Sequence, residues 1–255
     1  MRFASLGSGS RGNATVVCHG QTILLIDCGF SAKETERRLQ AIGIDPRQLT
    51  AIVLTHEHAD HVSGVRVMAR KYRLPVYATP GTAGGLAADL IGYIKEFSSH
   101  DDFEIADIAV HPFPVPHDAR EPSQFVFSDG QHRLGLLTDV GMTTPLIEQA
   151  LTCCDALLLE ANHDMEMLDS GDYPDHLKYR VSGRLGHLNN VQSANILKRL
   201  DTSRLQHIVA MHLSEKNNCP ELVSKLFCDV LNCETSWVGI AEQDAGFAWR
   251  ELQIN

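Results

Sequence analysis

The segment THEHADH, residues 55–61, determines how this sequence of 255 residues is interpreted. It follows an apolar run that is typical of a strand, and it carries four side chains that bind metal ions: His56, His58, Asp60 and His61. Imidazole nitrogens suit zinc, iron, manganese or nickel, and a carboxylate adds affinity for harder cations. A solvated polar loop would rarely contain so dense an H-x-H-x-D-H pattern. The segment therefore predicts a metal site at the end of a strand.

Further metal-binding side chains follow apolar runs elsewhere in the chain. His117 stands in VPHDA, Asp139 in LLTDVG and His212 in AMHLS, and Asp27 occupies in LLIDCG the place that Asp139 has in LLTDVG. The segment around THEHADH has its own counterpart, because AIVLTHEH and HIVAMHLS are both apolar strands that end in histidine. Strand ends belong to a rigid scaffold, which is the best place for a catalytic site.

The order of predicted elements indicates an α/β fold. Strand-like and helical segments alternate in two halves, each of which begins with a meander of strands. SAKETERRLQAIG is expected to be a helix with Ser31 as its N-cap, and residues 82–97 are expected to be largely helical. We expect two β-rich layers packed face to face with helices outside. No Pro/Gly/Ser-rich linker divides the chain, so residues 1–255 are predicted to form a single domain.

Composition limits the possible functions. The net charge of −10 argues against a protein that coats DNA non-specifically. The start of the sequence lacks the apolar stretch of a signal peptide, and no apolar run is long enough for a membrane span. The seven cysteines include no C-x-x-C pair, which favours reduced thiols in a cytoplasmic protein. We expect a cytoplasmic protein without a membrane partner; its oligomeric state is left open.

The glycine-rich stretch GSGSRGN, residues 7–13, contains the G-x-G-x-x-G pattern of a dinucleotide-binding turn. Such a turn must be followed by a helix, whereas the β-branched run after it predicts a strand. NAD binding is therefore not expected. Glycines allow a tight connection between strands, and small side chains beside it would suit a substrate phosphate. We expect three of them to line the rim of the site: Ser8, Ser10 and Asn13.

Taken together, these motifs resemble the metallo-β-lactamase fold superfamily, in the order that the family shows them. The resemblance implies a four-layer αβ/βα sandwich with two mixed β-sheets flanked by helices. It implies two divalent metal ions, zinc or manganese, one on His56, His58 and His117 and the other on Asp60, His61 and His212. Asp139 would bridge the ions, and Asp27 would support the metal loop through hydrogen bonds. Such a pair of ions clamps a phosphodiester and makes hydroxide available at neutral pH.

Three segments narrow the resemblance to the YycJ/WalJ-type branch: GSGSRGN, LEANHD and GHLNN. Arg11 and Asn189 depart from that branch's pattern, but neither change removes a ligand. The branch implies a nuclease, most specifically a 5'-to-3' DNA exonuclease, and we assign Asp60 and His187 as its catalytic residues. In phosphodiesterases of this fold, such as ribonuclease Z, a histidine between the bridging Asp and the last ligand protonates the leaving oxygen, and the resemblance implies this general-acid role for His187. The alternative for His187 is that it only packs against or caps the helix that follows it.

Two further residues are expected to support the metal ligands or to contact the substrate. His163 in LEANHD is expected either to support the ligands or to touch the substrate. Arg184 stands in a basic segment, together with Lys178 and Arg180, that would suit the phosphates of a DNA end. A solvated helical face is the alternative interpretation of that segment.

Other functions remain open at this level. A small-molecule hydrolase of the same fold, such as a cyclic phosphodiesterase, a glyoxalase II-type thioesterase or a lactamase, would need the same ligands. A redox role would need an electron-transfer domain for which the chain has no room, and a binding role is disfavoured because every ligand position is intact. The sequence does not distinguish zinc from manganese, or DNA from RNA or a small phosphodiester.

Overall fold

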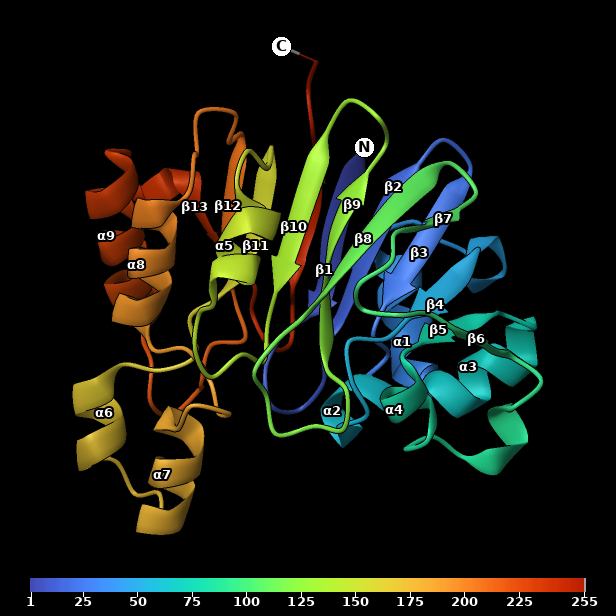
Figure 1. Cartoon of the computed structure of the whole chain (residues 1–255), viewed down its shortest axis with the longest axis horizontal. Coiled ribbons are helices and arrows are strands. Elements are labelled where there is room, and N and C mark those ends of the chain that lie inside the picture. The colour runs from blue at the N-terminus through green and yellow to red at the C-terminus, as the bar shows by residue number, and fades with distance from the viewer. Residues whose placement is uncertain (255) are drawn as a thin grey trace.

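The computed structural model describes residues 1–254, which form two mixed β-sheets packed face to face (Figure 1). The first sheet has seven strands in the order β14-β1-β2-β3-β4-β5-β6. They are β1 (Arg2–Gly7), β2 (Ala14–His19), β3 (Thr22–Ile26), β4 (Ala51–Val53), β5 (Val76–Ala78), β6 (Ile94–Glu96) and β14 (Phe247–Glu251). The last strand pairs with the first, so the end of the chain completes the sheet that its beginning starts.

The second sheet has seven strands in the order β13-β12-β11-β10-β9-β8-β7. They are β7 (Phe103–Ile105), β8 (Ile108–Pro114), β9 (Ser123–Ser128), β10 (Arg133–Leu137), β11 (Ala156–Glu160), β12 (His207–Met211) and β13 (Val238–Ile240). Each sheet begins with antiparallel hairpins and continues with parallel strands. The change occurs at β3 in the first sheet and at β10 in the second. The two halves that resemble each other in sequence therefore resemble each other in topology.

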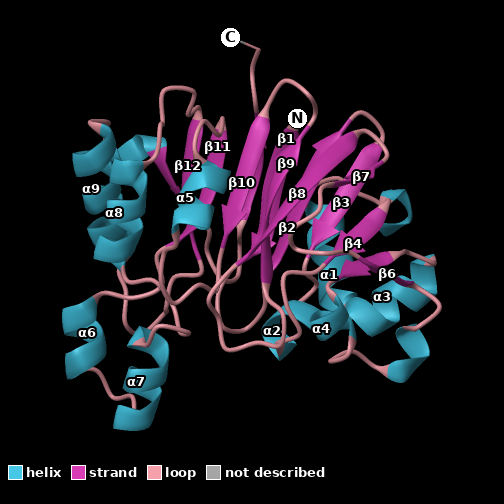
Figure 2. Cartoon of the chain, in the orientation of Figure 1, coloured by secondary structure: helices cyan, strands magenta, loops and turns pink. Residues whose placement is uncertain are grey.

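Helices cover the outer face of each sheet (Figure 2). Those of the first half are α1 (Ala32–Ala41), α2 (Ala59–Val62), α3 (Val65–Tyr72) and α4 (Pro80–Ala83). The helices of the second half are α5 (Pro145–Leu151), α6 (Met165–Ser170), α7 (Asp175–Ser182), α8 (Asn190–Arg199) and α9 (Pro220–Leu231). Of these, α6 and α7 extend beyond the sheet and do not cover its face (Figure 2). Single 3₁₀ turns occur at Pro46–Gln48, Ala88–Leu90 and Thr235–Trp237. The expected sandwich of two helix layers around two sheets is confirmed.

Three apolar clusters hold the layers together. Leu24 and Ile26 of β3 point into the cluster between the sheets, where they meet Phe125. Leu25, between them in the sequence, points to the opposite side and packs with Leu39 of α1. This alternation follows the period of two in a strand. Complete burial of each of these large side chains stabilises the fold by about 1.5–3 kcal/mol.

Local signals explain where α1 begins and why one predicted helix is wrong. The Ser31 side chain accepts a hydrogen bond from the Glu34 backbone N–H, as expected for an N-cap. Residues 82–97 are not largely helical, because they contain only the end of α4, a 3₁₀ turn and β6. Gly84, Gly85 and Gly92 interrupt this segment, and glycine is among the weakest helix formers.

None of the helices in residues 1–254 is long and apolar enough to cross a membrane.

Candidate active site

The loops that carry the sequence-predicted ligands come together at the edge where strands of both sheets end (Figure 1). A cleft of about 310 Å³ opens there, and it is lined by five of these ligands, whereas His56 and His61 are buried and do not line it. The loops after β4, β8, β10 and β12 supply most of the ligands. The cleft is lined by Ser10, His58, Asp60, His117, Asp139, Asn162, Tyr173, Leu177, Arg180, Val181, His187, His212, Leu213 and Ser214.

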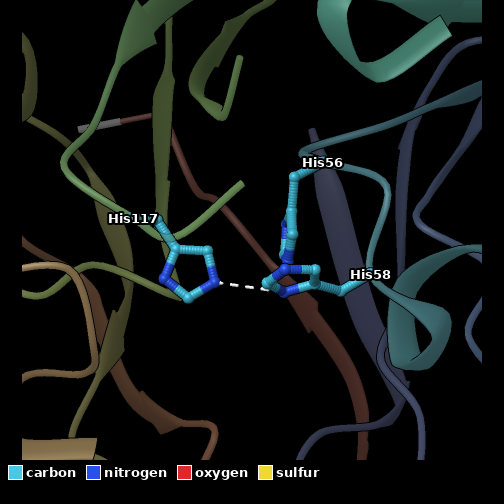
Figure 3. Close-up of side chains that lie close together, drawn as sticks. All are labelled: His56, His58 and His117. Atoms are coloured by element: carbon cyan, nitrogen blue, oxygen red, sulfur yellow. Dashed lines mark hydrogen bonds between the residues drawn. The ribbon is translucent and has the colours of Figure 1, made fainter. Parts of the chain in front are cut away.

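Three histidines form the first cluster, in which one ring nitrogen from each lies within 4.8 Å of the others (Figure 3). The Nε2 atom of His117 lies 3.3 Å from Nδ1 of His58. His56 is completely buried after β4, and its Nδ1 lies 2.9 Å from the Thr55 hydroxyl. Burial holds the pKa of His56 well below its ordinary value, and the neighbouring His61 lowers it further. The neutral imidazole is the form that binds a metal ion.

A second cluster consists of Asp60, His61 and His212. The Oδ2 atom of Asp60 lies 3.6 Å from Nε2 of His61 and 3.8 Å from Nε2 of His212. Asp139 lies between the clusters, since it shares a third group with His56 and His61. Its Oδ2 is 3.2 Å from Nε2 of His61, and its Oδ1 is 3.7 Å from Nε2 of His212.

Three buried atoms of these clusters have no hydrogen-bond partner within residues 1–254: His56 Nε2, Asp139 Oδ2 and His212 Nε2. The 3.2 Å contact of Asp139 Oδ2 with His61 Nε2 is close but is not a hydrogen bond. Burying such atoms without a partner is costly. Divalent cations would satisfy all three, and a mixed set of imidazoles and carboxylates suits zinc and manganese. Although burial opposes the charge of Asp139, the neighbouring His212 and His61 hold its pKa well below the usual range. The residues present therefore fit the metal ions that the sequence implies.

Asp27 lies behind the second cluster and makes three hydrogen bonds there. Its Oδ1 accepts from the Thr55 backbone N–H at 2.9 Å, and its Oδ2 accepts from the Thr55 hydroxyl at 2.8 Å. The same Oδ2 lies 2.7 Å from Nδ1 of His61. A carboxylate on Nδ1 favours the tautomer whose Nε2 is free to bind a metal ion. This position agrees with the supporting role that the resemblance implies.

Three of the site residues have left-handed backbone conformations. The φ angles are 59° at Asp27, 54° at Asp139 and 56° at His212. Asp27 follows β3 and Asp139 follows β10, the strands at which the two sheets change from antiparallel to parallel pairing. A left-handed conformation costs an L-residue roughly 1–2 kcal/mol, and such strain is concentrated at functional sites.

Glu160 is a central residue of the site to which the sequence motifs assign no role. It is completely buried at the end of β11, where its two oxygens accept hydrogen bonds from the backbone N–H groups of Asp139, Val140 and Leu188. Burial alone would raise its pKa, but the His187 imidazole lowers it to about 2. The available signal was the sequence LLLE, an apolar strand that ends in an acid as LLID and LLTD do.

His187 lines the cleft beside the clusters, and its side chain is 18% exposed. Its Nδ1 lies 2.8 Å from Oε1 of Glu160 and 3.6 Å from Oδ1 of Asp139. Its ring stacks on that of His212 at a centroid distance of 5.1 Å. Because an ionised Glu160 requires a proton on Nδ1, the other ring nitrogen is left to face a substrate.

His163 lies behind the cleft and is not among the residues that line it. It is completely buried, and burial lowers its pKa to about 4. Its backbone carbonyl accepts a hydrogen bond from the Asn190 N–H. The neighbouring Asn162 reaches the site instead, because its Nδ2 donates to the His212 carbonyl at 2.9 Å. The position of His163 agrees with a residue that supports the metal ligands and not with one that contacts the substrate.

The glycine-rich loop holds the ligands from behind more than it lines the rim. Ser10 lines the cleft, but Ser8 and Asn13 are buried. The Ser8 hydroxyl accepts from the His212 backbone N–H at 2.9 Å, and Nδ2 of Asn13 lies 3.1 Å from Nε2 of His61. Of the three residues expected at the rim, Ser10 alone is among those that line the cleft.

The backbone N–H groups of the glycine-rich loop largely form hydrogen bonds within the protein. The N–H groups of Gly9, Arg11, Gly12 and Asn13 all donate to protein oxygens. The Arg11 guanidinium pairs with Glu215 and Asp244. A phosphate-binding array of free N–H groups is thus not present in these four residues.

In the basic segment, Arg180 lines the cleft, whereas Arg184, the residue assigned from the sequence, does not. Arg184 is exposed, and its Nε contacts Met142 Sδ at 3.4 Å; it does not line the cleft. Arg180 lines the cleft from α7, and its Nε donates to Oδ2 of Asp118 at 2.7 Å. The difference arises because α7 ends at Ser182 and the chain turns before Arg184.

Comparisons with known proteins agree with this fold. Residues 22–212 match the family model of the beta-lactamase superfamily domain. The chain is 36% identical to the exodeoxyribonuclease YycJ of Bacillus anthracis over 247 residues, which cover 95% of this chain and 92% of that protein. It is 35% identical to the exodeoxyribonuclease WalJ of Streptococcus pneumoniae over 246 residues, or 94% and 91% of the two proteins.

A solved structure shows the same fold. The metallo-β-lactamase fold protein YhfI of Bacillus subtilis superposes with a TM-score of 0.73 at 17% identity, covering 98% of this chain and 99% of that one. The chain therefore belongs to the metallo-β-lactamase fold superfamily. It is a metal-dependent hydrolase of that superfamily, and it falls in the YycJ/WalJ branch, whose relatives named above are exonucleases.

Proposed function

We propose that this protein is a phosphodiesterase with two divalent metal ions that removes nucleotides from DNA ends in the 5'-to-3' direction. The observation that carries the proposal is the convergence of His56 Nε2, Asp139 Oδ2 and His212 Nε2, buried and unpartnered in residues 1–254, beside an open cleft. A catalytic metal site requires such an open side for water and substrate. The similarity to two exodeoxyribonucleases over more than nine-tenths of the chain supports DNA as the substrate.

The ligand assignment follows the two clusters. His56, His58 and His117 would hold one ion, Asp60, His61 and His212 the other, and Asp139 would contact both. Zinc or manganese bound there would neutralise charge on the phosphate and lower the pKa of a bound water. Asp60 also lines the cleft, so its carboxylate is placed to accept a hydrogen bond from the attacking water.

His187 supplies the proton for the leaving group in this proposal. As the water oxygen bonds to phosphorus, one proton of the water passes to the Asp60 carboxylate. The bond from phosphorus to the leaving oxygen breaks, and the leaving oxygen takes a proton from His187 Nε2. Glu160 holds the opposite nitrogen of the ring at 2.8 Å and thereby fixes its orientation.

A panel of substrates tests the class of reaction. Metal-loaded protein is incubated with single- and double-stranded DNA, bis(p-nitrophenyl) phosphate, a thioester and a β-lactam. We expect cleavage of DNA and of the small phosphodiester, and no cleavage of the other two. Asp139→Asn is the matched control for a contaminating nuclease, because asparagine tolerates the left-handed φ of 54° at this position. Turnover of the thioester without any phosphodiester cleavage would contradict the proposal.

A further inference from the structure

One wall of the cleft consists of residues that belong to neither metal cluster. Tyr173, Leu177, Arg180 and Val181 line the cleft from α7 and the turn before it, and we call these four residues the α7 wall. Figure 1 shows α6 and α7 projecting beyond α8 and α9 on the side where the site loops lie. No residue of α7 is buried, so the helix is not held in place by core packing. These side chains therefore line the cleft and do not belong to the apolar core.

Arg180 is the one lysine or arginine among the residues that line the cleft. Asp118 fixes it through the 2.7 Å hydrogen bond to Nε, and the Asp118 carbonyl lies 3.1 Å from Nε2 of His58. The arginine is thereby tied to the loop that carries His117. A guanidinium has five N–H donors, and this side chain is 60% exposed. Its remaining donors are consequently held at the cleft in a defined orientation.

The other three residues of the α7 wall form an apolar surface. Leu177 and Val181 are one helical turn apart, so they lie on the same face of α7. Tyr173 is half-buried beside them, with Nζ of Lys216 at 5.8 Å from its ring centroid. An aromatic ring next to a fixed positive charge is the arrangement that proteins use to bind single-stranded nucleic acid, with the base on the ring and the backbone on the cation.

We propose that the α7 wall is the nucleoside subsite of this enzyme: Tyr173 stacks on a base next to the scissile phosphate, Leu177 and Val181 contact its sugar, and Arg180 binds an adjacent phosphate. This inference rests on the proposed phosphodiesterase function and adds the substrate class, a single strand with a base. The cleft of about 310 Å³ is at the small end of ligand pockets. A pocket of this size holds one nucleotide unit.

Two measurements test the subsite, and one of them is independent of turnover. The first is binding of a short, fluorescent, 5'-phosphorylated phosphorothioate oligothymidylate, followed by anisotropy. The second is kcat/KM for two diesters with the same leaving group, thymidine 5'-(p-nitrophenyl phosphate) and methyl p-nitrophenyl phosphate. The variants are Tyr173→Ala and Arg180→Ala. Tyr179→Ala and Arg47→Ala are matched controls, because both residues are exposed and do not line the cleft.

We expect Tyr173→Ala to weaken oligonucleotide binding by at least about fivefold, the lower limit for loss of one stacked base. Its kcat/KM should fall for the thymidine ester and stay unchanged for the methyl ester, and Tyr173→Phe should restore both readouts. Arg180→Ala should weaken oligonucleotide binding, and both controls should behave as wild type. Unchanged binding in Tyr173→Ala and Arg180→Ala, or equal losses on the two esters, would overturn the subsite. If the wild type cleaves neither ester, the proposed function is overturned. The binding measurement would still show whether the α7 wall is a nucleoside subsite.

Discussion

The Nδ1 atom of His187 lies 2.8 Å from Oε1 of Glu160, a carboxylate that no solvent reaches. Through its other contacts, Glu160 also fixes the backbone at Asp139 and Leu188. One buried side chain therefore positions both the residue between the metal clusters and the proposed proton donor. This explains how a loop after β10 and a loop before α8 keep a constant relation to each other.

Removal of the His187 imidazole is predicted to reduce turnover without reducing metal binding. We expect His187→Ala to keep the wild-type metal content, because the unpartnered ligand atoms belong to other residues. Turnover of a phosphodiester should fall by about 10²-fold or more, the usual contribution of a general acid. Metal analysis and steady-state kinetics on the same preparation check this prediction. A normal rate in His187→Ala would show that the residue only packs against α8.

Asp27 is predicted to control metal affinity without contacting the metal. Asp27→Asn keeps the shape and tolerates the left-handed φ of 59°, but it loses the charge that orients His61. We expect metal affinity to fall by roughly 10–100-fold, measured by titration against a competing chelator. Asp101→Asn, at an exposed position far from these contacts in the sequence, serves as the control. Equal affinities in Asp27→Asn and the control would contradict the supporting role.

Backbone strain at His212 gives a prediction about stability. Its φ of 56° suits glycine and strains alanine. Neither His212→Gly nor His212→Ala has the imidazole, so a comparison of the two isolates the backbone term. In metal-free protein, we expect the glycine variant to have the larger free energy of unfolding, by about 1 kcal/mol. Urea denaturation measures the difference, and a more stable alanine variant would rule out strain at this position.

Acid stability is predicted to depend on Asp129, which lies far from the cleft residues in the fold. Its buried carboxylate accepts from the N–H of His132 at 2.8 Å and pairs with the terminal amine of Met1 at 3.1 Å. Burial opposes its ionisation, but hydrogen bonds from His132 and the amine hold its pKa below the usual range. Because the folded-state pKa is depressed, the stabilisation is complete above the ordinary pKa and is lost as the pH falls through the folded-state value.

The variant Asp129→Asn tests this dependence. At neutral pH, we expect its free energy of unfolding to be lower than that of the wild type by about 1.5–3 kcal/mol, the range for hydrogen bonds to a charged group. The difference should shrink below the ordinary pKa of aspartate, while phosphodiester turnover at neutral pH stays unchanged. A difference that is the same at all pH values would show that charge is not the cause.

The sequence predicts the sandwich and its clusters well because the decisive residues stand next to recognisable patterns. His56 to His61 are nearly consecutive, and Asp27 and Asp139 each end an apolar strand of the same type. Glu160 ends such a strand too, but a glutamate outside the ligand motif has no sequence feature that predicts complete burial. Its role depends on contacts between loops that are far apart in the chain.

Other features depend on packing that no local pattern encodes. Ser8 and Asn13 are small and polar, which predicts an exposed rim, whereas the loop folds under the site and buries them. Arg180 and Arg184 are indistinguishable in the sequence, and only the end of α7 at Ser182 separates the one at the cleft from the one outside it. Gly85 is a further position where packing decides the residue. A Cβ there would lie 2.7 Å from the Glu57 side chain, and no local sequence pattern indicates this close contact.

The most direct test of the central claim is a time course with single-stranded DNA labelled at its 5' end, or at its 3' end in a parallel reaction. We predict that metal-loaded protein releases the 5' label as a mononucleotide from the earliest time point and shortens the 3'-labelled strand progressively. Chelation or Asp139→Asn should abolish both changes. Intact DNA in the presence of protein that binds metal ions, or early release of the 3' label instead, would contradict a 5'-to-3' exonuclease.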